Sequence, residues 1–320
     1  MAVKAVVVGG GSWGTAFSCL LRDRGHEVTL ACRDPEQARE IAATGRNPRY
    51  LSTADLTGVT AATIDAAPMA DADVVAVAVP SGAFAAVVTG LPGDAPVLSL
   101  TKGLDPASGE LLHTLVRDRP VAVLSGPNFA EEIAAGLPCA SVIASRDEAL
   151  AERLQGEINS SLFRVYVNTD LTGVEFCGAA KNVIALAAGG VDGLGLGDNA
   201  KAGVITRGVA EMTRLGSACG ARPETFAGLA GMGDLMVTCW SRLGRNRAAG
   251  ELIAHGRTPE EAVAEIGHVV EGITSAPVLR DLAHRERVEL PITEAICGVL
   301  AGTSLQELIA SLMGRQPKGE

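Results

Sequence analysis

The order of apolar and polar residues changes character about halfway along the chain. In the first half, short apolar runs alternate with stretches of helical composition. We expect buried strands at residues 4–8, 27–32, 73–79, 97–100, 121–124 and 141–144, and helices at 12–24 and 34–43. Continuous apolar runs are typical of parallel strands that are covered on both faces. Their alternation with helices predicts an α/β fold of Rossmann type, with a doubly wound parallel sheet.

After about residue 170 the pattern is that of helices separated by Gly-rich loops. Apolar residues recur at helical spacing from Ile205 to Leu215 and predict a helix over 199–215 with one face in a core. Further helices are expected at 260–266, 276–283 and 304–313. The sequence therefore predicts two domains, an α/β domain over residues 1–170 and an all-α domain over residues 171–320.

Composition and charge exclude several classes of protein. No uninterrupted apolar run approaches the ~20 residues of a membrane span, and the N-terminus lacks the features of a signal peptide, so we expect a cytoplasmic protein. A net charge of −10 disfavours nucleic acid as a partner, but a small phosphorylated substrate needs only a local cation or two. The seven scattered cysteines and five histidines show no ligand spacing, which predicts neither a disulfide framework nor a metal site.

A glycine-rich turn follows the first predicted strand. Gly9, Gly11 and Gly14 have the spacing Gly-x-Gly-x-x-Gly between that strand and the next helix. In this motif the first glycine permits the tight turn, the second lets the backbone approach a pyrophosphate, and the third permits close packing of helix on strand. A flexible loop is the alternative. The placement between strand and helix favours a site for a nicotinamide dinucleotide, whose phosphates would face the free N–H groups of the helix.

The end of the second predicted strand bears on the choice between NAD and NADP. NAD enzymes usually carry an acidic residue there, which binds the ribose 2′-hydroxyl. Here the strand ends in Ala31-Cys32-Arg33-Asp34. Arg33 can stack on adenine and pair with a 2′-phosphate, whereas Asp34 lies one residue further on and is a candidate cap for the next helix. We therefore expect NADP to be favoured over NAD, or both to be used. The alternative is that Arg33 is merely solvated.

Two lysines are candidates for the chemistry. Lys181 lies among small residues shortly after Glu175, a setting that packing explains poorly. Hydride transfer to a carbonyl leaves an alkoxide that must gain a proton, and a lysine can supply it when nearby positive charge and burial lower its pKa. Lys102 follows the strand at 97–100 and is expected at the carboxyl edge of the sheet, where α/β proteins bind ligands. For each lysine, an ordinary surface position is the alternative.

A cationic segment, Arg245-Asn246-Arg247, is predicted to lie in a Gly-flanked loop. A guanidinium offers bidentate recognition of a phosphate, and Asn246 adds a neutral donor. On spacing alone, a phosphate site and a solvated loop are equally good interpretations. Asp234, which precedes this segment, is a candidate either to hold Lys181 or to cap a helix.

Taken together, these motifs resemble the bacterial, soluble NAD(P)-dependent glycerol-3-phosphate dehydrogenases. The matching stretches follow the order of that family and cover nearly the whole chain: residues 9–16, 47–51, 100–104, 125–130, 178–182, 199–202, 206–208, 231–235, 245–247 and 269–272. The resemblance implies reversible oxidation of sn-glycerol 3-phosphate to dihydroxyacetone phosphate with NAD(P). It also implies a homodimer that works mainly in the reducing direction, supplying phospholipid synthesis.

The resemblance further implies roles for individual residues. Lys181 becomes the proton donor and acceptor, with Lys102, Asp234 and Thr238 beside it. The substrate positions are Lys102, Gly126, Asn128, Lys181, Asn182, Asp234, Gly244, Arg245 and Asn246. The nucleotide positions are Gly9, Gly11, Ser12, Trp13, Gly14, Arg33, Lys102, Ala130, Arg245, Val269 and Glu271.

Four positions depart from the pattern of the family. Asn128 stands where the family usually has Ser or Thr, and Gly244 where it has Ser, so a hydroxyl donor is lost at each position and is partly replaced by an amide at 128. Ala180 replaces a large apolar residue, and Gly203 replaces an alanine. Loss of one hydrogen bond to a charged group costs ~1.5 to 3 kcal/mol. Asn128 and Gly244 therefore leave open a related NADP-dependent dehydrogenase for another small phosphorylated or acidic substrate. A protein that senses NADP without chemistry is a separate alternative.

Overall fold

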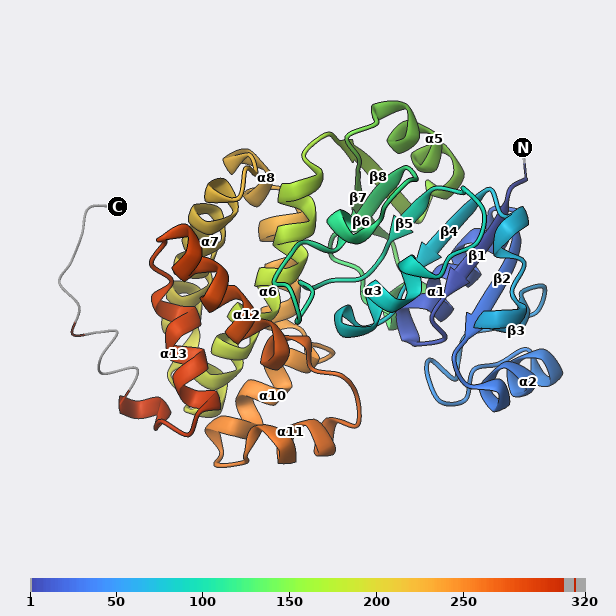
Figure 1. Ribbon diagram of the computed structural model, residues 1–320. Helices are drawn as coiled ribbons and strands as arrows, with labels where there is room; N and C mark the ends of the chain where they lie inside the picture. The colour runs from blue at the N-terminus through green and yellow to red at the C-terminus, as the bar shows by residue number, and fades with distance from the viewer. Residues whose placement is uncertain (1, 308–313, 315–320) are drawn as a thin grey trace. The chain divides into compact units, whose positions relative to one another are not determined.

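The computed structural model describes residues 2–307 and 314 (Figure 1). The chain divides into two compact units, one of residues 1–105 and 110–175, the other of residues 106–109 and 176–320. Helix α6 (Leu171–Gly193) begins immediately after the predicted domain boundary, and its first residues, up to Glu175, are counted with the first unit.

The first unit is built on an eight-stranded sheet with the order β3-β2-β1-β4-β5-β6-β7-β8. Its strands are β1 Lys4–Val8, β2 Glu27–Cys32, β3 Thr60–Thr63, β4 Val74–Val77, β5 Val97–Ser99, β6 Val121–Ser125, β7 Cys139–Ala144 and β8 Phe163–Asn168. Every pairing from β3 through to β6 is parallel. The six predicted strands and the doubly wound sheet are confirmed.

One pairing departs from the predicted parallel arrangement. β6 and β7 run antiparallel, with Ser125 opposite Val142, and β7 and β8 then run parallel. A short apolar run carries no information about strand direction, so the sequence pattern does not show this reversal. β3 and β8 are additional to the prediction. They lie at the two edges of the sheet, where half-exposed side chains weaken the apolar signal.

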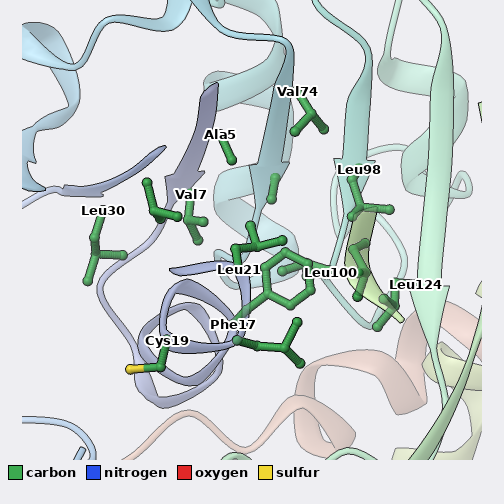
Figure 2. Close-up of a cluster of buried hydrophobic side chains, with 14 of the residues drawn as sticks. Ala5, Val7, Phe17, Cys19, Leu21, Leu30, Val74, Leu98, Leu100 and Leu124 are labelled. Carbon is green, nitrogen blue, oxygen red and sulfur yellow. The ribbon is translucent and has the colours of Figure 1, made fainter. Parts of the chain in front are cut away.

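Apolar clusters cover both faces of this sheet. The helices of the first unit are α1 Ser12–Asp23, α2 Pro35–Thr44, α3 Ser81–Thr89, α4 Ala130–Ala134 and α5 Glu148–Ile158. One cluster joins Val7 of β1 to Phe17 of α1 (Figure 2), and the other joins Val8 of β1 to Phe84 of α3. Adjacent residues of β1 thus enter opposite clusters, which is why its apolar run is continuous rather than alternating.

The second unit is helical. Besides most of α6 it contains α7 Gly197–Ala218, α8 Pro223–Phe226, α9 Asp234–Trp240, α10 Arg245–Ala254, α11 Pro259–Ile266, α12 Glu271–Glu286 and α13 Pro291–Leu300. The helices predicted at 199–215, 260–266 and 276–283 are confirmed within α7, α11 and α12. The helix predicted at 304–313 falls largely outside the described residues.

Helix α6 forms the core of the second unit. By length and composition it would be able to cross a membrane, but 94% of its apolar segment is buried inside the protein, as in the core helix of a globular domain. Small residues let α10 approach it closely. A Cβ added to Gly189 of α6 would lie 1.9 Å from the carbonyl oxygen of Arg247, and one added to Gly250 of α10 would lie 2.0 Å from that of Leu186. This contact fixes the start of α10 against the middle of α6.

Candidate active site

The turn after β1 has the backbone geometry of a dinucleotide site. Gly9 has a φ of +120°, and a Cβ there would lie 2.4 Å from the carbonyl oxygen of Ala78. A Cβ at Gly14 would lie 1.9 Å from the carbonyl oxygen of Gly9. At Gly11, in contrast, an added Cβ would meet no protein atom within 4 Å. Internal packing therefore requires glycine at 9 and 14 but not at 11, where the absence of a side chain leaves room for a pyrophosphate.

Two buried amide side chains hold this turn in shape. Gln37 and Asn47 donate to the carbonyl oxygen of Gly10 at 2.7 and 2.9 Å, and Asn47 also donates to the hydroxyl of Thr15 at 2.8 Å. They brace the backbone just before α1 against its first turn. Sequence reasoning assigned no role to either residue, because no spacing rule points to a distant amide that bonds to backbone.

Arg33 and Asp34, at the end of β2, have different surroundings. Arg33 is exposed. Asp34 accepts the N–H of Glu36 at 2.8 Å as the N-cap of α2, which confirms the predicted cap, and it forms an ion pair with Arg49. The hydrogen bonds from Glu36 and then from Arg49 lower the pKa of the Asp34 carboxyl. This carboxylate is thus already engaged with a cation, whereas the guanidinium of Arg33 suits a 2′-phosphate.

Three further predicted nucleotide residues lie on two helices that pack together. Ser12 and Trp13 open α1, Ala130 opens α4, and the two helices are in contact. The indole Nε1 of Trp13 is buried and has no hydrogen-bond partner among the described residues. A buried donor without a partner is costly, and an acceptor atom of a bound nucleotide would satisfy it.

The first unit also brings three predicted substrate residues together. Lys102 follows β5 at the carboxyl edge of the sheet, as expected, and its Nζ donates to the carbonyl oxygen of Gly126 at 2.9 Å. Gly126 follows β6 with a φ of +149°. Asn128 is two residues further on, and its Oδ1 accepts the hydroxyl of Ser141 at 2.6 Å. Sequence reasoning missed Ser141, since its neighbour is set by the antiparallel pairing of β6 and β7.

In the second unit, Lys181, Asp234 and Thr238 form a buried cluster. Their exposed fractions are 6%, 1% and 5%. The Lys181 Nζ donates to Asp234 Oδ1 at 2.5 Å and to Thr238 Oγ1 at 2.9 Å. A buried ammonium needs such an anionic partner to offset the loss of its hydration. The structure thus excludes a surface position for Lys181, and of the two roles left open for Asp234 it shows the contact with the lysine.

The backbone segment before α9 sets the positions of Asp234 and Thr238. Leu229–Gly233 form a π-helical turn, in which a Cβ at Gly231 would lie 2.2 Å from the carbonyl oxygen of Phe226. Such turns occur often at functional sites. Asp234 then begins α9, and Thr238 follows four residues later, so both side chains lie on the helix face toward Lys181.

The cationic segment is the start of a helix, so its prediction as a loop is wrong. Arg245 is the first residue of α10 and is exposed, with Gly244 as the N-cap. The flanking Gly250 suggests a loop in the sequence, but it is needed for the close approach of α10 to α6. A Cβ at Gly244 would lie 2.6 Å from the carbonyl oxygen of Thr238, so the backbone here has no room for a side chain unless it shifts.

Asn246 links three helices through its buried amide. Its Nδ2 donates to Asn182 Oδ1 on α6 at 2.9 Å, and its Oδ1 accepts the N–H of Gly272 on α12 at 2.8 Å. Gly272 follows Glu271, the first residue of α12, while Val269 is exposed just before that helix. The predicted substrate residues Asn182 and Asn246 therefore contact each other, and the predicted nucleotide residue Glu271 directly precedes Gly272, which bonds to Asn246.

A partly buried ion-pair network includes Arg247 of α10. Asp192 Oδ2 accepts Lys201 Nζ at 2.7 Å and Arg247 Nη1 at 2.8 Å. Burial alone would raise the pKa of Asp192, but the hydrogen bonds and charges of the two cations bring it below its ordinary value. Sequence reasoning gave Asp192 no role, since a single acidic residue at a helix end carries no motif.

The described residues supply a backbone turn for phosphates in one unit and an oriented ammonium in the other. Within residues 2–307 there is no group of three or more His, Cys, Asp or Glu side chains placed to hold a metal ion. The ammonium of Lys181 is suited to proton transfer. The turn and the unpaired indole of Trp13 fit a nicotinamide dinucleotide, which would supply the hydride.

Comparison with known proteins gives the family. The chain matches the models for the N-terminus and the C-terminus of NAD-dependent glycerol-3-phosphate dehydrogenase over residues 4–151 and 170–310. Relatives named glycerol-3-phosphate dehydrogenase (NAD(P)+) include those of Nocardia farcinica, 46% identical over 99% of both chains, and Halorhodospira halophila, 43% identical over 100% of this chain and 99% of the other. The crystal structure of glycerol-3-phosphate dehydrogenase from Coxiella burnetii has a TM-score of 0.94 and 36% identity, covering 98% of this chain and 99% of that one. The predicted resemblance is confirmed, and the chain belongs to the NAD-dependent glycerol-3-phosphate dehydrogenase family.

Proposed function

We propose that this protein interconverts sn-glycerol 3-phosphate and dihydroxyacetone phosphate with NAD(P), and that it supplies glycerol 3-phosphate for phospholipid synthesis. The observation that carries the proposal is the buried contact of Lys181 with Asp234 and Thr238. Reduction of the ketone develops negative charge on its oxygen, and a fixed ammonium can donate the proton that this oxygen needs. In the reverse direction, the neutral amine accepts the proton of the substrate hydroxyl.

The neighbours of Lys181 support this role. The carboxylate of Asp234 favours the charged lysine, and the hydroxyl of Thr238 donates to the carbonyl oxygen of Asp234 at 2.6 Å, which leaves its lone pairs to accept from Nζ. Both contacts fix the direction of the side chain before substrate binds. Preorganisation of this kind lowers the reorganisation needed during proton transfer.

Anion-binding groups in both units support a phosphorylated substrate. Arg245 is exposed at the N-terminus of α10, where the helix dipole also favours an anion. Lys102 is half-buried in the first unit, with its Nζ held by the carbonyl oxygen of Gly126. We propose that these two cations bind the substrate, and that Asn182 and Asn246 hold the segment around Lys181 in place.

The surroundings of β2 support NADP as the favoured cofactor. Asp34 is the carboxylate closest in sequence to the end of β2, and it already pairs with Arg49 and caps α2. Arg33, in contrast, is exposed and cationic. We further propose a cytoplasmic homodimer. Size-exclusion chromatography with light scattering tests the oligomeric state.

The test is a cofactor-by-substrate assay. Oxidation of NADPH and of NADH is measured with dihydroxyacetone phosphate and with a panel of other small phosphorylated and acidic ketones. We expect the highest kcat/KM for NADPH with dihydroxyacetone phosphate. A higher kcat/KM with another ketone would favour the related dehydrogenase that Asn128 leaves open, and nucleotide binding without turnover of any ketone would identify a sensor.

A further inference from the structure

An unpaired amide nitrogen lies among the proposed substrate residues. The Nδ2 of Asn128 is buried and has no hydrogen-bond partner among the described residues. A buried N–H group without a partner is costly, so a native protein keeps one only for a reason. The carbonyl oxygen of Gly126, two residues earlier, holds the ammonium of Lys102, which makes this a donor-rich end of the sheet.

The other end of the same amide is fixed by Ser141. This serine is 0% exposed on β7, and its hydroxyl donates to Asn128 Oδ1 at 2.6 Å. In the structure this hydroxyl contacts the oxygen end of the planar amide, which therefore points toward β7. The nitrogen therefore lies at the opposite end, away from the strand.

The antiparallel pairing of β6 and β7 makes Ser141 and Asn128 neighbours. Because Ser125 pairs with Val142, the chain that leaves β6 runs alongside the first half of β7. Gly126 permits this approach, since a Cβ there would lie only 3.1 Å from the Cα of Ser141. A parallel β7 would instead present its carboxyl end to this segment.

We propose that Ser141 is a positioning residue for substrate binding. Its hydroxyl holds Asn128 so that the amide nitrogen, and not the oxygen, faces the bound ketone or its phosphate and donates a hydrogen bond to an oxygen atom of that ligand. The pair thereby replaces the single hydroxyl that the related enzymes are expected to carry at position 128. This inference rests on the proposed function, because it assigns the donor to the small phosphorylated substrate of that reaction.

The decisive experiment is a double-mutant cycle between Ser141→Ala and Asn128→Ser. In the wild-type background, Ser141→Ala frees the amide to present either end, so KM for dihydroxyacetone phosphate should rise about 3- to 10-fold while kcat and the Kd for NADPH change less than about 2-fold. In the Asn128→Ser background, Ser141→Ala should leave KM nearly unaltered. A serine hydroxyl can donate a hydrogen bond in any orientation, so it does not need Ser141 to orient it. An equal rise in both backgrounds, or no rise in either, would overturn the proposal.

Ser145→Ala is the matched control for the loss of a buried serine. Ser145 is 1% exposed just after β7 and donates to the carbonyl oxygen of Val121 at 2.8 Å, away from Asn128. We expect this variant to lose thermal stability much as Ser141→Ala does, but to keep the wild-type KM. If both variants raise KM together, the effect of Ser141 is a general loss of stability and the proposal is wrong.

A second variant tests the direction of the amide. Asn128→Asp keeps the shape but replaces the nitrogen donor with an acceptor, so KM for dihydroxyacetone phosphate should rise about 30-fold or more. A KM close to that of the wild type would contradict a donating nitrogen. Failure of the proposed function would give a different result from failure of this inference alone. The wild type itself would then bind NADPH without reducing dihydroxyacetone phosphate, and the inference would also be wrong.

Discussion

The two units present their proposed site residues in different ways. In the first unit the residues lie on turns at strand ends, and glycine backbone sets their positions: Gly9 and Gly126 have positive φ, and a backbone carbonyl holds Lys102. In the second unit the residues lie on helices, and side chains hold one another, as Asp234 and Thr238 hold Lys181. We therefore expect substitutions at the glycine turns to reveal most about the site of the first unit, and the loss of single polar side chains to reveal most about the site of the second.

The largest effect is expected in the second unit. Lys181→Met removes the proposed proton donor, so kcat should fall about 10³-fold, within the range for general acid catalysis, while the Kd for NADPH stays within about 2-fold of the wild type. Single-turnover kinetics and fluorescence titration measure the two quantities. Lys201→Met is the matched control, since it removes another buried ammonium that pairs with Asp192. If both variants lose kcat equally, the special role of Lys181 is refuted.

Two glycines of the first unit should respond differently to the same added methyl group. Gly14→Ala places a Cβ against the carbonyl oxygen of Gly9, so we expect a thermal midpoint several degrees lower, or no folded protein. Gly11→Ala meets no protein atom, so its midpoint should match the wild type while the Kd for NADPH rises about 10-fold or more. Thermal denaturation and nucleotide titration provide the readouts. Equal stability loss in the two variants would contradict the account of the turn.

Cofactor preference should depend on one exposed cation. Arg33→Gln removes the proposed partner of the 2′-phosphate, so KM for NADPH should rise about 10-fold or more and KM for NADH should stay unchanged. Steady-state kinetics with both cofactors measure the effect. A parallel change in both KM values would assign Arg33 to adenine stacking alone.

The smallest effect is expected from Asp192→Asn. Burial raises the pKa of Asp192, but its contacts with Lys201 and Arg247 outweigh burial and leave that pKa below the ordinary value of 3.8. A carboxyl with a lower pKa in the folded chain contributes stability above its unfolded pKa and loses it as pH falls through the folded pKa. The wild type should therefore have the higher thermal midpoint near neutral pH, and the difference should shrink below about pH 4. A difference that stays constant down to pH 3 or grows would contradict this assignment.

Much of the fold could be predicted because it depends on local patterns. The continuous apolar runs, the glycine turn and the Asp34 cap each carry their signal within a few residues. The direction of β7 could not be predicted, because strand pairing depends on partners distant in sequence. The start of α10 could not be predicted either, because Gly250 serves a close approach to α6 rather than a break in the helix.

The residues of the proposed site also divide into those that a local motif reveals and those that only a distant contact reveals. Lys181, Lys102 and Arg245 lie in motifs and could be singled out, although their roles stay predictions. Gln37 and Ser141 could not, because each acts through hydrogen bonds to residues on other elements of the chain. Such supporting residues become visible only when the fold brings the two segments together.

Lys181 is the residue through which this chain is proposed to reduce dihydroxyacetone phosphate with a nicotinamide cofactor. The most direct measurement is the rate of NADPH oxidation at increasing concentrations of dihydroxyacetone phosphate, for the wild type and for Lys181→Met. We predict saturable turnover by the wild type and a rate about 10³-fold lower for the variant, with NADPH bound by both. Folded wild-type protein that binds NADPH but shows no turnover, or a variant that turns over at the wild-type rate, would contradict the account.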